Sequence, residues 1–307
     1  MAGNLIALRR RIKSVRNTRK LTKAMKTVAA AKLRRASGEL RRSQAYRDRI
    51  SMMLQEAGSR AGQAVLSGQS PKGTGADTLP LLSANERGAA LLVVVAGDKG
   101  LCGAFNSHVL KQGEAIVREI ADSGREVLLV TVGSKAERYF SKRNVAVKKA
   151  YSGMLGRLQF EDAARLAADL QELFRSEALH SVEFASSEFV SASKQQFSRR
   201  RLFPVEISAD VPAGAETETE PLPAIFEPDA EAIVRALLPR FITAVVYQFL
   251  LQSIAAEQVA RMVAMEMATR NANDMIRALT LQMNKMRQAA ITSELLELIT
   301  ATEALNK

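Results

Sequence analysis

The residues whose spacing most suggests chemistry are Gly97, Gly100 and Gly103, which follow the apolar run at 89–96. A glycine-rich loop between a strand and a helix binds the pyrophosphate of a dinucleotide when it reads Gly-x-Gly-x-x-Gly. Lys99 stands at the second glycine of that pattern, where the backbone must approach the phosphates. The sequence therefore favours a tight loop at the carboxyl edge of a sheet, and a nucleotide-using enzyme remains a competing hypothesis.

Other reactive side chains are scarce. Cys102 is the only cysteine, so the chain cannot form an internal disulfide or a multi-cysteine metal site. The only base near it in sequence is His108, and we interpret it as a small buried residue rather than a reactive thiol. The chain has no Gly-x-Ser-x-Gly elbow, no His-Glu-x-x-His pair and no acidic metal loop. We therefore predict no catalytic residue, no cofactor and no metal.

The positive charge is concentrated at the start of the chain. The formal net charge of the 307 residues is +12, and residues 1–50 hold sixteen Lys or Arg but only two acids. A transit peptide is too short to explain this pattern, which continues past residue 40. A phosphate-binding helix is the alternative, although no aromatic residue interleaves the basic ones before Tyr46. We favour the flank of a coiled coil that faces an acidic partner over a nucleic-acid-binding protein.

Two long helices are predicted at the ends of the chain, because residues 4–57 lack proline and residues 229–307 lack glycine. In both segments apolar residues recur at alternating three- and four-residue spacing, which is typical of a coiled-coil seam. A phase slip is expected in each seam, near Arg19 and near Arg270. After the first slip we expect the seam to resume through Leu21, Met25 and Val28. We expect the two helices to pair antiparallel as a rod. The chain has no stretch of eighteen uninterrupted apolar residues, so we predict no membrane span.

The middle of the chain alternates apolar strand patterns with helical ones, which predicts a Rossmann-like α/β domain with a largely parallel sheet. The expected strands lie at 89–96, 126–132 and 145–148, with a hairpin or adjacent edge strands at 181–193 and 201–208. The expected helices lie at 104–122, 134–142 and 160–177. The predicted divisions are a coiled-coil helix at 1–58, a linker at 59–88, the α/β domain at 89–208, a linker at 209–228 and a second coiled-coil helix at 229–307.

Four separated blocks, in order along nearly the whole chain, resemble the gamma subunit of F-type ATP synthases. They are Arg10–Val15 with Leu21–Met25, Val28–Leu33, Gly97–Gly103 with Phe105 and Asn106, and Ala260–Met265 with Arg287–Leu295. The resemblance implies a non-catalytic rotor shaft that couples rotation of a proton-driven membrane ring of c subunits to ATP synthesis and hydrolysis. The implied partners are three alpha and three beta subunits, the epsilon subunit and the c-ring, with no nucleic acid and membrane contact only through the c-ring.

The resemblance also implies sites and a location. Contacts with the catalytic ring are expected at Lys23, Met25, Lys26, Arg261, Gln288, Thr292 and Glu294. Contacts on the epsilon and c-ring side are expected at Asp98, Lys99 and Cys102. Because the first block begins close to Met1, a bacterial protein is expected, peripheral on the cytoplasmic face of the plasma (inner) membrane.

Overall fold

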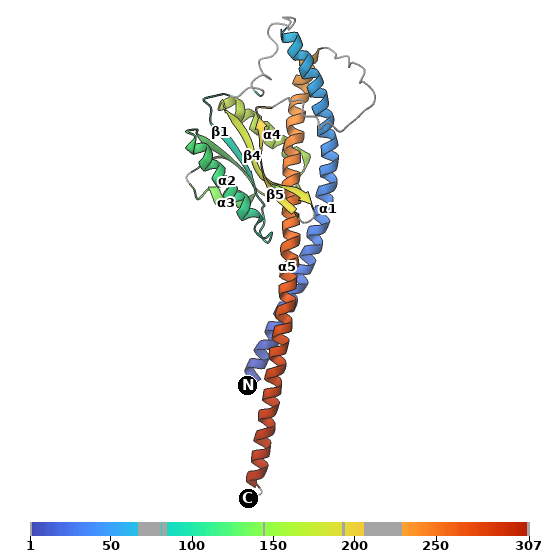
Figure 1. Cartoon of the computed structure of the whole chain (residues 1–307), viewed down its shortest axis with the longest axis vertical. Coiled ribbons are helices and arrows are strands. Elements are labelled where there is room, and N and C mark those ends of the chain that lie inside the picture. Colours follow the sequence, from blue (N-terminus) through green and yellow to red (C-terminus); the bar gives the residue numbers. More distant parts are fainter. Residues whose placement is uncertain are drawn as a thin grey trace. The chain divides into compact units, whose positions relative to one another are not determined.

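The computed structural model describes residues 2–66, 81, 85–143, 145–191, 194–205 and 229–305. Its elements, in chain order, are α1 (Ala2–Leu66), β1 (Ala90–Val95), α2 (Phe105–Asp122), β2 (Val127–Val132), α3 (Ser134–Phe140), β3 (Ala146–Tyr151), η2 (Met154–Arg157), α4 (Phe160–Ser176), β4 (Ser181–Ser191), β5 (Lys194–Phe203) and α5 (Ala230–Leu305) (Figure 1). Contacts divide the chain into two compact units, residues 32–260 and residues 1–31 with 261–307.

The unit of residues 32–260 is built on a five-stranded sheet with the order β3-β2-β1-β4-β5. The first four strands are parallel, and only β5 is antiparallel to its neighbour β4. The central strand β1 is buried along its whole length, which is why its sequence is continuously apolar. The predicted α/β fold with a largely parallel sheet is therefore confirmed.

Both faces of the sheet are covered. On one face, Leu92 and Val94 of β1 belong to a core with residues of α2 and α3. On the other face, Leu91 and Val93 belong to a core with α4, the end of α1 and the first half of α5. Parallel strands need helical crossovers, and those helices exclude water from both faces.

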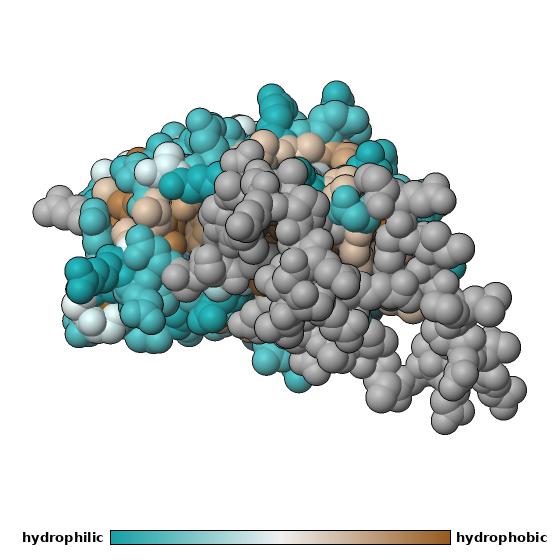
Figure 2. Space-filling model, turned by 90° about the horizontal axis from the view of Figure 1, so that it is seen from above, coloured by the Kyte–Doolittle hydropathy of each residue, from teal (hydrophilic) through white to brown (hydrophobic). Residues whose placement is uncertain are grey.

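Among the described residues, only α5 is long and apolar enough by composition to cross a membrane. A core helix passes the same test, and the first half of α5 lies in the protein interior. Leu238, Ile242, Val246 and Leu250 are fully buried against the sheet. In the space-filling view, hydrophilic residues surround smaller hydrophobic areas on the described surface (Figure 2).

Two predicted boundaries differ from the structure. The helix expected to end at residue 58 continues to Leu66, because a glycine in a helix interior costs only about 1 kcal/mol, too little to end a helix at Gly58 or Gly62. The last strand, expected at 201–208, is β5 at Lys194–Phe203. The sequence of β5 is too polar to resemble a buried strand. An end strand of a sheet can be this polar because it tolerates exposed charges. The two predicted linkers lie largely or wholly outside the described residues, and the domain division remains a prediction.

In the unit of residues 1–31 and 261–307, α1 and α5 run antiparallel. Three contacts show this: Arg19 donates to Asn273 at 3.2 Å, Thr22 meets Thr269 at 2.8 Å, and Lys26 meets Glu266 at 3.2 Å. The residue numbers in each pair add up to 291 or 292, so the register is constant across two turns of helix.

The predicted phase slips in this unit are wrong. On α1, every position of one three-four series is buried or half-buried: Leu8, Ile12, Val15, Arg19, Thr22, Lys26 and Ala29. On α5 the matching series is Met265, Thr269, Ala272, Ile276, Leu279, Met283, Met286 and Ala290. Leu21 and Val28, expected in the seam, are 61% and 56% exposed. The seam contains the polar residues Arg19, Thr22 and Lys26 instead. They can lie there because each has a hydrogen-bond or ion-pair partner on the other helix.

Candidate functional site

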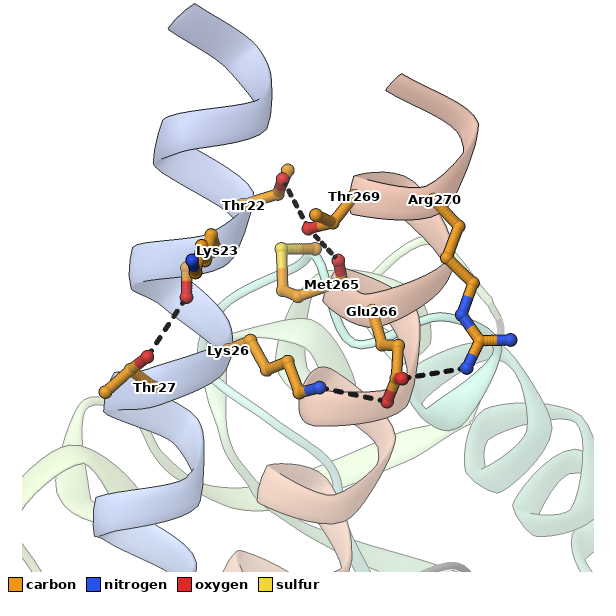
Figure 3. A network of polar contacts seen from close by, with 8 residues as sticks. All are labelled: Thr22, Lys23, Lys26, Thr27, Met265, Glu266, Thr269 and Arg270. Carbon is orange, nitrogen blue, oxygen red and sulfur yellow. Dashed lines mark hydrogen bonds and ion pairs between the residues drawn. The ribbon is translucent and has the colours of Figure 1, made fainter. Parts of the chain in front are cut away.

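A polar segment of the helix pair is the first feature that could serve a function (Figure 3). The Thr269 hydroxyl donates to the carbonyl oxygen of Met265 at 2.7 Å. It also lies 2.8 Å from the hydroxyl of Thr22, which in turn reaches the carbonyl oxygen of Arg19 at 3.1 Å. A hydrogen bond between the two hydroxyls, whichever of them donates it, therefore crosses the seam. One turn away, Lys26 and Arg270 both contact the carboxylate of Glu266, at 3.2 and 2.9 Å. The hydrogen bond from Lys26, and then that from Arg270, hold the pKa of Glu266 below its usual value.

Apolar side chains point outward at the same level. Leu21, Met25 and Val28 lie at helical spacing on α1, where two are exposed and Met25 is half-buried; we call these three residues the outer stripe. On α5, Val263 and Met267 are also exposed. On α1 the usual pattern of a soluble helix pair is therefore inverted at this level, with polar groups in the seam and apolar groups in solvent, while Met265 and Ala272 of α5 remain buried. Exposed apolar residues gathered in this way mark an interaction surface.

The structure brings together four of the seven residues expected to contact the catalytic ring. Lys23, Met25 and Lys26 share about one turn of α1, near the level of Glu266, and Arg261 lies five residues before Glu266 on α5. Lys23 is exposed, and Lys26 is half-buried by its ion pair. Sequence reasoning found Met25 but missed the outward direction of Leu21 and Val28; their exposure follows once Thr22 and Ala29 are placed in the seam.

The other three residues lie elsewhere in the same unit. Gln288, Thr292 and Glu294 are exposed on α5, at least 22 residues and about 33 Å beyond Glu266. The constant register places the start of α1 level with residue 290, so α5 continues past its partner there. Several large apolar side chains of this last part are exposed: Ile291, Leu295, Leu296, Leu298 and Ile299.

The glycine-rich loop at 97–103 is held by two polar side chains. One carboxylate oxygen of Asp98 accepts from the backbone N–H of Ser134 and of Gly153, at 3.0 and 2.9 Å. The Asn106 amide accepts from the Gly97 N–H at 2.8 Å and donates to the Lys99 carbonyl at 3.1 Å. The loop is thus held by Asp98, which ties it to neighbouring segments, and by Asn106 of α2, as expected for a tight loop rather than a phosphate site.

The three residues expected on the epsilon and c-ring side take different positions in this loop. Lys99 is exposed, the carboxylate of Asp98 is turned toward neighbouring loops, and Cys102 is only 1% exposed. Leu101, which sequence reasoning missed, is 65% exposed and has a φ of 63°. This left-handed conformation costs a leucine about 1–2 kcal/mol, so the loop holds an apolar side chain in solvent under strain. Within the described residues, no three His, Cys, Asp or Glu side chains could hold a metal ion together.

Comparisons with known proteins point in one direction. A protein-family model described as ATP synthase matches residues 4–305. The ATP synthase gamma chain of Anaeromyxobacter sp. (strain Fw109-5) is 37% identical over 298 residues, covering 97% of this chain and 98% of that protein. The gamma chain of Solibacter usitatus (strain Ellin6076) is 38% identical over 301 residues, covering 98% and 99%.

Solved structures agree in fold. A chain of the Euglena gracilis mitochondrial ATP synthase OSCP/F1/c-ring structure matches with a TM-score of 0.63 and 18% identity, covering 99% of this chain and 95% of that one. A chain of the Tetrahymena thermophila mitochondrial ATP synthase central stalk/c-ring structure matches with a TM-score of 0.55 and 24% identity, covering 81% and 99%.

Proposed function

We infer which surfaces of this chain contact other subunits from its family membership. The chain belongs to the family of the ATP synthase gamma chains. The chain is a central stalk subunit, a rotor shaft that couples rotation to ATP synthesis and hydrolysis. It is not catalytic itself; the complex that contains it is the enzyme. A shaft must be stiff, and it must have surfaces that its partner subunits contact.

The proposed assembly has three alpha and three beta subunits around the shaft, with an epsilon subunit and a proton-driven c-ring at its foot. Structural relatives come from F1/c-ring assemblies, which supports this arrangement. The proposed location is peripheral, on the cytoplasmic face of a bacterial plasma membrane, with membrane contact only through the c-ring. The cationic first helix then faces acidic protein surfaces and not nucleic acid.

The outer stripe is the proposed grip of the catalytic ring, and the inverted exposure of the helix pair carries this proposal. Leu21 and Val28 are directed away from α5 although the seam between them holds Thr22 and Lys26. Selection for stability alone would favour the opposite arrangement. Lys23 beside the stripe, together with Lys26 and Arg261, supplies positive charge for acidic loops of the catalytic subunits.

A second proposed contact lies near the end of α5. Gln288, Thr292 and Glu294 are exposed in the part of the helix that α1 does not accompany, among exposed leucine and isoleucine side chains. A third proposed contact, toward the epsilon subunit and c-ring, is the loop at 97–103. There Lys99 and Leu101 reach solvent, while Asp98 and Cys102 give the loop its form.

Replacing Val28 by aspartate tests the grip. The chain should be produced with its complex in membrane vesicles, and both ATP hydrolysis and ATP-driven proton pumping should be measured. A charge in an apolar contact should lower pumping per ATP hydrolysed severalfold. Thr27→Asp is the matched control, because it adds the same charge one residue away, at another exposed position. Equal loss of pumping in both variants, or none in either, would refute the assignment of the outer stripe.

A further inference from the structure

The loop at 97–103 is packed against α5, within the unit of residues 32–260. Cys102 and Phe105 form a buried cluster with Ala256 of α5, and Ala260 packs against it. Alanines on the helix allow this close approach, since they add no side chain beyond the Cβ atom. The sheet and the long helix are therefore joined at the carboxyl end of β1 by a second contact, separate from the large core on the sheet face.

A carboxylate lies in the middle of this contact. Glu257 is only 6% exposed, although glutamate is a polar residue and α5 has exposed positions elsewhere. A methyl group built on Gly97 would lie 3.0 Å from both Cδ and Oε1 of Glu257, and 3.1 Å from Oδ1 of Asn106. A side chain at residue 97 would therefore fit only if the carboxyl group of Glu257 shifted by a few tenths of an ångström.

The backbone of Gly97 does not itself require glycine. Among the described residues, the glycines with positive φ are Gly103, Gly124, Gly133 and Gly153, and Gly97 does not belong to this group. Its missing side chain therefore serves the approach of Glu257 and not a left-handed turn. This separates the role of Gly97 from that of the ordinary turn glycines.

The position of this contact is where sheets of this kind bind ligands. In an open parallel sheet, ligands bind outside the carboxyl ends of the strands, where the strand order reverses. Here β1 is that strand, because its crossover neighbours β2 and β4 lie on its two sides. Gly97 follows the end of β1, and the carboxylate of Glu257 fills the place beside it. The sheet uses its ligand-binding edge to hold a helix of its own chain.

We propose that Glu257 and Gly97 are positioning residues that fasten the α/β sheet to α5, so that torque on one is carried by the other. Because Glu257 is buried and lies close against Gly97, a displacement of α5 along its axis would drive the carboxyl group into the loop. The torque part of this proposal rests on the shaft function stated above; the fastening does not.

Gly97→Ala tests the fastening in the assembled complex in membrane vesicles. The added methyl group should displace Glu257 and loosen the loop, so Cys102 should react with a maleimide about tenfold faster or more. Pumping per ATP hydrolysed should fall by about half or more, since a loosened joint loses torque. Gly156→Ala is the matched control, because a Cβ at Gly156 meets nothing within 4 Å.

Shortening the glutamate provides a rescue. In Gly97→Ala/Glu257→Asp the carboxylate is one methylene further back, so labelling and pumping should both return toward the parent values. Glu257→Asp alone should loosen the joint, and it carries the test if Gly97→Ala does not assemble. A role in folding alone would lower the amount of complex without changing the pumping ratio, and the double variant would not restore that ratio.

The outcomes separate the two ideas. Unchanged labelling of Cys102 in both single variants would overturn the fastening. Faster labelling with an unchanged pumping ratio would overturn the positioning role and leave the shaft function intact. A chain that is not the shaft would give a different result. Complexes with and without the parent chain would then pump protons equally well.

Discussion

The seam of the helix pair can be tested at two adjacent residues of α1. Ala29 is 1% exposed and belongs to the seam, whereas Val28 is 56% exposed and belongs to the outer stripe. Ala29→Leu inserts three carbon atoms where α5 is already packed, and overpacking of this kind costs about 1–3 kcal/mol. Val28→Ala removes two carbon atoms that are less than half buried.

The cost of Val28→Ala is small for two reasons. Full burial of two methylene equivalents contributes about 1.6 kcal/mol, so the buried share here is about 0.7 kcal/mol. Alanine is a better helix former than valine by about 0.5 kcal/mol, which offsets most of that loss. The expected net change is therefore close to zero. If Val28 were in the seam, the transfer term alone would reach about 1.6 kcal/mol before any cavity is counted.

Hydrogen exchange followed by mass spectrometry measures this difference locally. In peptides covering residues 20–35, Ala29→Leu should speed exchange about 5- to 150-fold, since each 1.4 kcal/mol is a factor of ten. Val28→Ala should leave the same peptides within about twofold of the parent, and peptides of β1 should not change in either variant. Faster exchange in Val28→Ala than in Ala29→Leu would refute the seam described above.

Three further predictions concern the ion pair and the loop. Lys26 and then Arg270 lower the pKa of Glu266 from its usual value of 4.5. The stabilisation by this carboxylate is therefore present above pH 4.5 and is lost as the pH falls through the lowered pKa. Hydrogen exchange at residues 262–270 should become faster over that range, and less so in Glu266→Gln. Asp98→Ala leaves the N–H groups of Ser134 and Gly153 without their acceptor, at about 1–3 kcal/mol each, so thermal unfolding should occur several degrees lower; Asp98→Asn, which keeps an oxygen, should lose less. Leu101→Gly relieves a left-handed leucine and should raise the Tm of the isolated chain slightly, while lowering coupling in the complex; a lower Tm would contradict the strain argument.

Most of the fold could be predicted from local pattern. The run ALLVVV of β1 can be satisfied only by a strand buried on both faces, and proline-free or glycine-free stretches at both ends predict long helices. The strand β5 was harder, because its arginines resemble a loop until β4 is known to pair with it. Pairing is a long-range property, and the residues of one strand do not encode it alone.

The seam shows why the candidate site was only partly predictable. If the seam is assumed to contain apolar residues only, it passes from Val15 to Leu21 and Val28, and its three-four spacing is interrupted between Val15 and Leu21. The structure continues instead through Arg19, Thr22 and Lys26, since their partners Asn273, Thr269 and Glu266 lie opposite. Those partners are about 250 residues away in sequence, so neither helix alone reveals that a polar seam is satisfied.

The two end strands of the sheet affect how readily the chain aggregates before it is assembled with its partners. Exposed lysines and arginines line both of them: Lys148 and Lys149 on β3, and Lys194, Arg199, Arg200 and Arg201 on β5. A strand with a free edge can recruit a strand from another molecule, and long charged side chains along the edge make such pairing unfavourable. A newly made copy that has not yet met its partners is therefore less prone to aggregate through these edges.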